Sequence, residues 1–352
     1  MLKELEIRNY RCFDHLTLRD FGRINFLVGQ SGSGKSAFLE AIFLASGISP
    51  EIYLRIRQFR GLPVSGIEVG DRDGYESLWR DLFFKFRQDE PVYINLKDNR
   101  TGARWVSISY GDTAPLTIRL DQPDKILEQS PLAAPKPITF QWYHSNNTFK
   151  TQVKVTKDGL QMDTFDEVYG AVYFFPGTFS AKENAKRFST LSKQNREHIV
   201  VESVLNLFPT IKGISIETIG GQPVLYASLA SLPEKIPVSV LSGGINKYMS
   251  LLIAICVNEN GAILVDELED GFYYHNYKDV MRSLIDACEK HRVQMFASSH
   301  SYEFLQSILP AVVDREDDFR VLRFSNEEGV TKIKTFEGKY YKSAIEQDIE
   351  IR

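Results

Sequence analysis

The chain has 352 residues, of which 43% are hydrophobic and 25% are charged, and these proportions exclude a disordered, collagen-like or coiled-coil protein. The length suggests one large domain or two moderate ones. Its 42 basic and 46 acidic residues give a net charge of −4, which argues against a protein that works mainly by coating nucleic acid or anionic lipid, so that any DNA contact must come from a local patch.

No stretch of the chain resembles a membrane anchor or an export signal. The longest apolar run, Leu251–Val257, is well short of the roughly 18 apolar residues that span a bilayer. The first seven residues alternate charged and apolar side chains and contain no signal-peptide core. Three scattered cysteines predict neither a disulfide framework nor a zinc site. We therefore expect a cytoplasmic protein of a reducing compartment, with no membrane partner.

The N-terminal segment predicts the beginning of an α/β core. Residues 2–7 alternate like a strand, and residues 23–28 form a second strand that leads into a glycine-rich loop. A helix is predicted over residues 35–46, where apolar side chains recur at helical spacing and Gly47 and Pro50 follow in the order typical of a helix end.

From about residue 90 to about residue 165 the period of the apolar residues changes to two, which is typical of half-buried strands. Turn-forming residues separate the alternating segments. This pattern predicts an antiparallel β lobe inserted into the core. The expected strands are residues 92–96, 105–109, 116–120, 138–142 and 151–155.

The remainder of the chain returns to a rhythm of alternating strands and helices. A buried strand at 171–175 is followed by a helix over about 181–207. The alternation in the last third predicts a parallel sheet. The other expected elements are strands near 213–218, 223–228, 261–266 and 293–298, and helices over about 244–257 and 276–291.

The glycine-rich loop fits the pattern G-x-x-x-x-G-K-[ST] at every position, between a hydrophobic strand and an amphipathic helix. Glycines let successive backbone N–H groups point at one anion, and the helix N-terminus adds partial positive charge. Lys35 is expected to reach the β- and γ-phosphates of ATP, and the Ser36 hydroxyl to hold Mg²⁺. The predicted nucleotide-binding residues are Gly29, Gln30, Ser31, Gly32, Ser33, Gly34, Lys35 and Ser36.

Two carboxylates follow the apolar strand at 261–266. A strand buried on both faces presents its C-terminal residues at the functional edge of a parallel sheet. Asp266 is then placed to bind Mg²⁺ through water, and Glu267 to polarise the attacking water. An ordinary acidic turn would have the same composition, but the phosphate loop upstream favours the nucleotide site.

A second possible anion site lies at Leu241–Gly244, where Ser242, Gly243 and Gly244 open a helix. These residues also suit an ordinary helix cap. One nucleotide does not need two phosphate cradles on one chain, so the second cradle is expected to close over the nucleotide of another copy. Two-fold symmetry would then give two composite sites per dimer.

His300 ends a second apolar strand 34 residues after Asp266, which leaves room for one loop, one helix and one strand between them. Neighbouring parallel strands can bring the two residues to the same sheet edge, where His300 could hydrogen-bond the γ-phosphate or the attacking water. A polar strand terminus without function remains the alternative.

Arg55, Arg57 and Arg60 form a basic run after the first helix. They could contact phosphates of DNA or RNA, or a partner protein. They could equally form a solvated helix face that pairs with nearby acidic residues.

Four segments, in their order along the chain, resemble the motifs of the ABC-type ATPase superfamily. The phosphate loop corresponds to Walker A, Leu241–Gly244 to the LSGG signature, Asp266–Glu267 to Walker B and His300 to the switch histidine. Residues 5–13 are similar to the first strand and turn of the RecF, SMC and OLD branch. Three further passages resemble the OLD-like AAA family ATPases of prokaryotic anti-phage and abortive-infection systems. They are residues 54–61, 266–272 and 294–303.

This resemblance implies a P-loop ATPase head of the α/β class that uses ATP and Mg²⁺ and forms a nucleotide-sandwich homodimer, or a larger assembly with an even number of heads. Lys35, Glu267 and His300 would be catalytic, and Ser242, Gly243 and Gly244 would act in trans. No glutamine stands plainly in a Q-loop, since Gln58 and Gln141 are both candidates. The implied single head is divided into an α/β core (1–60 and 232–352), an inserted β lobe (about 90–165) and a helical signature region (about 180–245).

The sequence is therefore compatible with two alternative functions. In the first, the head hydrolyses ATP and controls a separate effector, a nuclease or toxin, in an anti-phage system, since the 52 residues after His300 are too few for the TOPRIM nuclease domain of OLD proteins. In the second, it is a RecF-like ATPase that binds DNA in repair or recombination. A transporter ATPase subunit, which would need a membrane partner, fits the opening segment less well.

Overall fold

The computed structural model describes the chain in several stretches. The expected strand at 116–120 lies outside them. The described residues are 1–62, 64, 72–99, 102–111, 136–156, 159–163, 165, 170–176, 179–349 and 351.

A six-stranded sheet forms the centre of the molecule, in the order β16-β15-β3-β14-β13-β9. Five strands run parallel, and β16 pairs antiparallel with β15 at one edge. The central strands are continuous apolar runs because both faces of the sheet are covered. The parallel sheet predicted from the βαβ rhythm is thus confirmed, whereas the β15–β16 hairpin was not predicted. The strands are β3 (Ile24–Gly29), β9 (Ala171–Phe174), β13 (Ala262–Val265), β14 (Gln294–Ser298), β15 (Phe319–Glu327) and β16 (Val330–Glu337).

A second sheet of seven strands is antiparallel throughout, in the order β2-β1-β4-β5-β6-β7-β8. The expected β lobe is therefore present, but β1 and β2 belong to it as well. Residues 1–60, which we assigned to the core as a unit, are divided between the two sheets, because the buried face of β1 aligns with β4 (Leu5 opposite Leu96). The strands are β1 (Leu2–Tyr10), β2 (Phe13–Arg19), β4 (Val92–Asp98), β5 (Gly102–Tyr110), β6 (Ile138–His144), β7 (Asn147–Thr156) and β8 (Gly159–Gln161).

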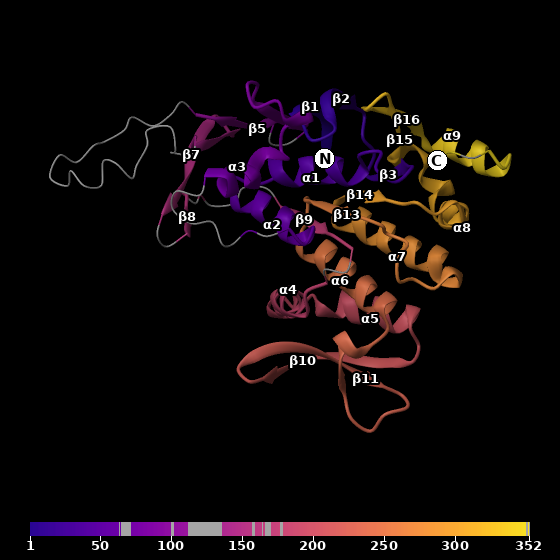
Figure 1. Ribbon diagram of the computed structural model, residues 1–352. Helices are drawn as coiled ribbons and strands as arrows, with labels where there is room; N and C mark the ends of the chain where they lie inside the picture. Colours follow the sequence, from indigo (N-terminus) through magenta and orange to yellow (C-terminus); the bar gives the residue numbers. More distant parts are fainter. Residues whose placement is uncertain are drawn as a thin grey trace.

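Helix α1 (Lys35–Ala45) lies between the two sheets, where all of its residues except Ser36 are buried. Alternate residues of the six-stranded sheet face opposite cores: Leu27 packs in the core that holds α1, and Phe26 in the core that holds α6 (Gly243–Val257). Helices α1 and α6 thus cover opposite faces of one sheet. In Figure 1 strands β1, β2 and β5 of the seven-stranded sheet lie at the top, followed downward by α1, the central sheet and α6.

The expected helix over 181–207 is two helices. Asn195 takes a left-handed conformation (φ 55°), and the carbonyl of Leu191 accepts the N–H of Arg196, which ends the first helix. The remaining helices are α2 (Glu51–Phe59), α3 (Arg72–Arg80), α4 (Ala181–Lys193), α5 (Glu197–Leu207), α7 (Tyr277–Lys290), α8 (Tyr302–Val312), α9 (Gly338–Glu346) and the 3₁₀ turns η1 (Phe84–Phe86), η3 (Val238–Val240), η4 (Tyr274–Asn276) and η5 (Val313–Asp318).

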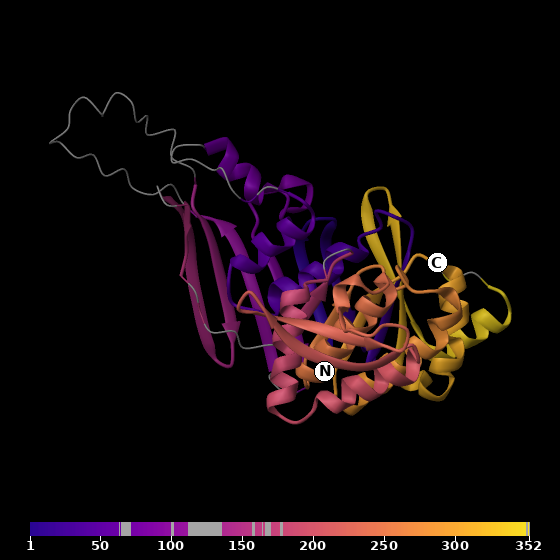
Figure 2. The same cartoon turned by 90° about the horizontal axis from the view of Figure 1, so that it is seen from below.

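A third, small sheet covers the helical side of the molecule. It is an antiparallel sheet of β10 (Ile211–Ile219), β11 (Gln222–Leu229) and β12 (Ile236–Pro237), whose hairpin turn uses Gly220 and Gly221 with positive φ. The expected strands near 213–218 and 223–228 are confirmed. Seen from below in Figure 2, this sheet lies across α4 and α5. Within the described stretches, no helix is long and apolar enough to cross a membrane.

Candidate nucleotide site

The phosphate loop joins β3 to α1 and curls around the ammonium group of Lys35. This side chain is only 4% exposed, and Nζ donates to the carbonyls of Gly29 (2.7 Å) and Gln30 (2.8 Å). Gly29 and Gly34 have φ values of 139° and 104°, a region that favours glycine. A Cβ at Gly29 would lie 2.3 Å from the carbonyl oxygen of Phe324 in β15, so the loop could not keep this path with another residue there.

The C-terminal hairpin supports the loop from outside. The Thr331 hydroxyl donates to the carbonyl of Ser33 (3.2 Å), and a Cβ at Gly34 would lie 2.9 Å from Cys12 Sγ and 3.2 Å from Thr331 Oγ1. The hairpin itself has a local signal, since residues 319–327 and 330–337 flank Glu328 and Gly329, whose positive φ values make the turn. Its contact with the phosphate loop has no such signal, because Thr331 and Ser33 are far apart in the chain.

The acidic end of β13 lies beside the phosphate loop. Burial lowers the pKa of Lys35 to about 8, while the carboxylates of Asp266, Glu269 and Glu267 act in the opposite direction. These groups act on Lys35 because β14 alone separates β13 from β3. The structure therefore brings together the phosphate loop and the Asp266–Glu267 pair, as their order along the chain predicts.

Asp266 is buried at the end of β13, and its Oδ1 accepts a hydrogen bond from the Ser298 hydroxyl of β14. The same Ser298 oxygen accepts the N–H of Glu267 (2.8 Å). One hydroxyl thus orients both acidic residues. Ser298 lies at the polar end of the strand that leads to His300, and the sequence pattern alone does not mark it as a site residue.

These residues fit a Mg²⁺ ion of the kind that nucleotides bring with them. Asp266 supplies a buried, oriented carboxylate, and Ser36, at the start of α1, supplies a hydroxyl. In the part of the chain that the structure describes, no three His, Cys, Asp or Glu side chains gather into a self-contained metal site. This donor set suits Mg²⁺, which is commonly held by one or two carboxylates together with substrate phosphates.

Glu267 sits on a sharp turn directly after β13, with a left-handed φ of 51° that non-glycine residues seldom adopt. Its carboxyl is partly buried. Burial raises the pKa of Glu267, and a hydrogen bond and the charge of Asp270, followed by Asp266, act in the same direction. A carboxylate whose pKa is raised toward the working pH is a better general base than one at its ordinary value.

His300 follows β14 at the same edge of the sheet. Its backbone N–H and that of Ser301 donate to Oε1 of the buried Glu269, at 2.7 and 3.1 Å. Burial lowers the pKa of His300, and the nearby positive charge of Lys35 lowers it further. The structure thus places His300 at the sheet edge that also holds Lys35, and its contact with a γ-phosphate stays a prediction. Glu269, which fixes this strand end, was not predicted as a site residue.

The Ser242–Gly244 cradle opens α6 and faces solvent. The Ser242 hydroxyl accepts the N–H of Ile245 (3.4 Å), and both Ser242 and Gly243 are exposed. A Cβ at Gly243 would meet no atom within 4 Å, whereas a Cβ at Gly244 would lie 2.5 Å from the carbonyl oxygen of Gly271. The cradle is therefore a capped helix start that is open on its outer side and packed against the loop after β13 on its inner side.

The arginine run is mostly engaged inside the protein. Arg57 is buried and pairs with Asp81 (3.0 Å), and Arg60 pairs with the fully buried Glu40 of α1 (2.6 Å). Arg55 is exposed and pairs with Glu51 one helical turn away (3.0 Å). Arg57 is thus inside the protein, Arg60 reaches from the surface to a buried carboxylate, and Arg55 stays on the surface. Of the two Q-loop candidates, Gln58 is exposed on α2 and Gln141 lies on β6 of the antiparallel lobe.

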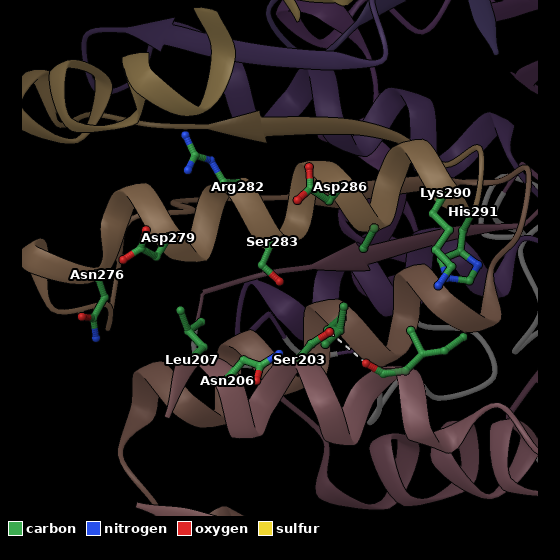
Figure 3. A pocket seen from close by; sticks show the side chains of 13 residues that line it. Ser203, Asn206, Leu207, Asn276, Asp279, Arg282, Ser283, Asp286, Lys290 and His291 are labelled. Carbon is green, nitrogen blue, oxygen red and sulfur yellow. Dashed lines mark hydrogen bonds between the residues drawn. The ribbon is translucent and has the colours of Figure 1, made fainter. Parts of the chain in front are cut away.

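A groove of about 500 Å³ lies away from the predicted nucleotide residues (Figure 3). Ser203 and Asn206 of α5 face Ser283 of α7 across it, and Leu252 of α6 contributes to its lining. None of the site residues that the sequence predicts lines this groove.

Comparison with known proteins places the chain among ATPases. A sequence model of the family described as AAA domain matches residues 4–202. Over 345 residues the chain is 24% identical to a Helicobacter pylori protein named ATP/GTP phosphatase, covering 91% of this chain and 90% of that one. Over 181 residues it is 21% identical to structural maintenance of chromosomes protein 6 of Schizosaccharomyces pombe, covering 48% of this chain but only 15% of that much longer protein.

The fold has a solved counterpart. A crystal structure of the Smc head bound to the C-winged helix domain of ScpA matches 96% of this chain and 97% of that chain, with a TM-score of 0.53 and 14% sequence identity. The likeness concerns the fold alone, at this level of identity. It agrees with the expected α/β head with mixed sheets.

Proposed function

The chain belongs to the AAA domain family and is an ATPase of the SMC/RecF type. From this premise we propose that two copies bind two ATP molecules between them and thereby control a separate effector protein. The observation that carries the proposal is that the two helices with glycine-containing starts, α1 and α6, lie on opposite faces of one sheet. The second start is open to solvent. Such a cradle suits the phosphates of a nucleotide bound by another copy.

Within each copy the predicted residues take complementary roles. Lys35 and the N–H groups of the loop hold the phosphates, and Ser36 and Asp266 hold Mg²⁺, which would neutralise charge on the phosphate oxygens. Glu267 accepts a proton from the attacking water, and His300 donates a hydrogen bond to the γ-phosphate. The γ-phosphate is also bound by the other copy, through its Ser242, Gly243 and Gly244.

The output of this cycle is proposed to lie in another protein. Among the described residues, no group of three or more His, Cys, Asp or Glu side chains is placed to hold the metal ion of a nuclease centre. The resemblance to OLD-like proteins of anti-phage systems suggests a nuclease or toxin as the effector. The Smc head that shares this fold was crystallised with a bound protein domain, which supports a protein partner for a head of this shape. The name of the Helicobacter pylori relative makes GTP a second nucleotide to test.

The test uses the Glu267→Gln variant, which retains shape but lacks the proton acceptor. We expect ATP or GTP hydrolysis to fall by about 10²- to 10⁴-fold while nucleotide binding persists. In light scattering, E267Q should dimerise when ATP and Mg²⁺ are added. The E267Q/G243D double variant, which places a carboxylate in the cradle, should remain monomeric. A molar mass of E267Q that does not change with ATP, or unchanged turnover in E267Q, would contradict the proposal.

The effector is then sought with tagged E267Q protein from its native cell. A protein that co-purifies in fixed ratio, withstands nuclease treatment and is lost with the E267Q/G243D double variant would support effector control. Retention of that protein on the monomeric variant would contradict the proposed link between dimerisation and control.

A RecF-like DNA-binding function is the second candidate, and Arg55 on the surface of α2 is the observation that favours it. ATP-locked E267Q should then bind DNA with an affinity that falls steeply with salt. Arg55→Ala should weaken that binding. Absent or salt-insensitive binding would remove this candidate.

A further inference from the structure

A buried lysine of α6 holds the turn that carries Glu267. Lys247 is only 4% exposed, and its Nζ donates to the carbonyl of Glu267 (2.7 Å) and to that of Asp270 (3.0 Å). The rings of Phe272 and Phe179 lie 5.5 and 5.9 Å from the ammonium nitrogen. Burial lowers the pKa of Lys247 to about 8, while Asp270, Glu269, Glu267 and Asp266 oppose that effect. This cation is thus removed from water and directed at two backbone carbonyls.

The backbone of Glu267 is held on both sides by these side-chain contacts. Its N–H donates to Ser298 Oγ (2.8 Å), and its carbonyl accepts from Lys247. The residue between these two bonds has the left-handed φ of 51°, a conformation that persists only where the surroundings impose it. Lys247 supplies one of the two restraints.

The same helix touches the turn a second time. Gly244 lies so close to the carbonyl of Gly271 that no Cβ would fit between them. Lys247 follows Gly244 by about one helical turn, so the start of α6 contacts both ends of the segment from Glu267 to Gly271. A displacement of α6 would therefore move the backbone of Glu267.

We propose that Lys247 is a positioning residue that holds Glu267 in its working conformation and ties that conformation to the place of α6. The inference rests on the proposed role of Glu267 as the base. Because α6 also begins with the Ser242–Gly244 cradle, a phosphate from the other copy that docks on this helix acts on the same turn. Lys247 touches neither phosphate nor water in this scheme and works through Glu267.

The test compares Lys247→Met, which keeps length but removes the donors, with Lys247→Arg, which keeps a charge and donors. Lys278→Met is the matched control, because it removes an exposed ammonium from neighbouring α7. We expect K247M to lower kcat for ATP by about 10- to 100-fold, the usual cost of a misplaced catalytic group, with KM within about twofold. K247R should recover part of the loss, and K278M should behave as wild type.

Two further measurements separate positioning from a general structural role. In hydrogen–deuterium exchange without nucleotide, the amides of residues 266–272 should exchange faster in K247M and not in K278M. In the E267Q background, K247M should cause no further loss of the residual turnover, because both changes act on one group. If K247M does not fold, Lys247→Gln, which shortens the side chain, is expected to show the same effects.

Wild-type kcat and wild-type exchange in K247M, or in K247Q where that variant replaces it, would overturn the inference. So would losses that multiply in the double variant. Unchanged turnover in E267Q alone would instead remove Glu267 as the base. The failure of the proposed site and the failure of this inference are therefore distinguishable.

Discussion

Replacing Glu40 by glutamine is expected to destabilise the protein far more than the same change at Glu51. Glu40 is fully buried on α1, with Arg60 Nε at 2.6 Å and Arg11 Nε at 3.1 Å from its carboxylate oxygens. Glu51 makes the same kind of pair with Arg55, but both side chains are more than half exposed. The two sites therefore contrast a buried with a solvated ion pair.

Removing one partner of a buried pair leaves an uncompensated charge and costs roughly 3–5 kcal/mol. Arg11 is 12% and Arg60 31% exposed, so water screens part of this cost, and we expect a loss of about 3 kcal/mol for Glu40→Gln. An exposed helical pair four residues apart contributes about 0.3–0.5 kcal/mol, which bounds the effect of Glu51→Gln.

The assay is equilibrium unfolding in urea, followed by circular dichroism, with both variants and the wild type at the same protein concentration. The slope with denaturant should stay constant while the midpoint moves. An E40Q midpoint no lower than that of E51Q would refute the reasoning that Glu40 anchors α1 through its buried arginines.

Three further outcomes follow from the site. Ser298→Ala removes the hydroxyl that orients Asp266 and Glu267, so activity at limiting Mg²⁺ should fall by about 10- to 100-fold; a titration of rate against Mg²⁺ that overlays the wild type would contradict this. Because burial lowers the pKa of Lys35 to about 8, its charge is present below that pH and lost above it, and ATP affinity measured with a fluorescent analogue should weaken by up to about tenfold per pH unit above pH 8. Lys35→Arg, which remains charged, should show no such decline, and an equal decline in both proteins would exclude Lys35 as its source. Arg57→Ala removes the pair with Asp81 and should lower the unfolding midpoint clearly, whereas Arg55→Ala should lower it no more than Glu51→Gln does. Equal midpoints for the two arginine variants would contradict the internal role of Arg57.

The parts of the site that can be predicted are those whose functional residues lie within a short segment of the sequence. The phosphate loop needs its glycines, lysine and serine within eight residues, and Asp266 and Glu267 directly follow an apolar strand. Strand order in a parallel sheet then brings these segments to one edge. The α/β class followed from the same alternation of strands and helices.

The supporting residues could not be predicted because their partners are remote in the chain. Thr331 meets Ser33 across 298 positions, and Ser298 meets Asp266 across 32. The arginine run illustrates the same limit, since a helical charge pattern looks alike whether it faces water or a buried Glu40. No local sequence pattern identifies Lys247 either, because its ammonium group meets the carbonyl of Glu267 only after α6 packs against the turn.

The position of α1 between two sheets bears on which parts of the protein can move during a catalytic cycle. Its residues belong to the core shared with the seven-stranded sheet, and they also cover one face of the central sheet. Any shift of α1 would disturb both sheets at once, so we expect the phosphate loop to keep its place relative to both sheets. Helices α4, α5 and α6 and the β10–β11 hairpin pack in the other core. We therefore expect any motion that follows nucleotide binding to be larger in that half, and distance probes anchored on the α1 side would measure it.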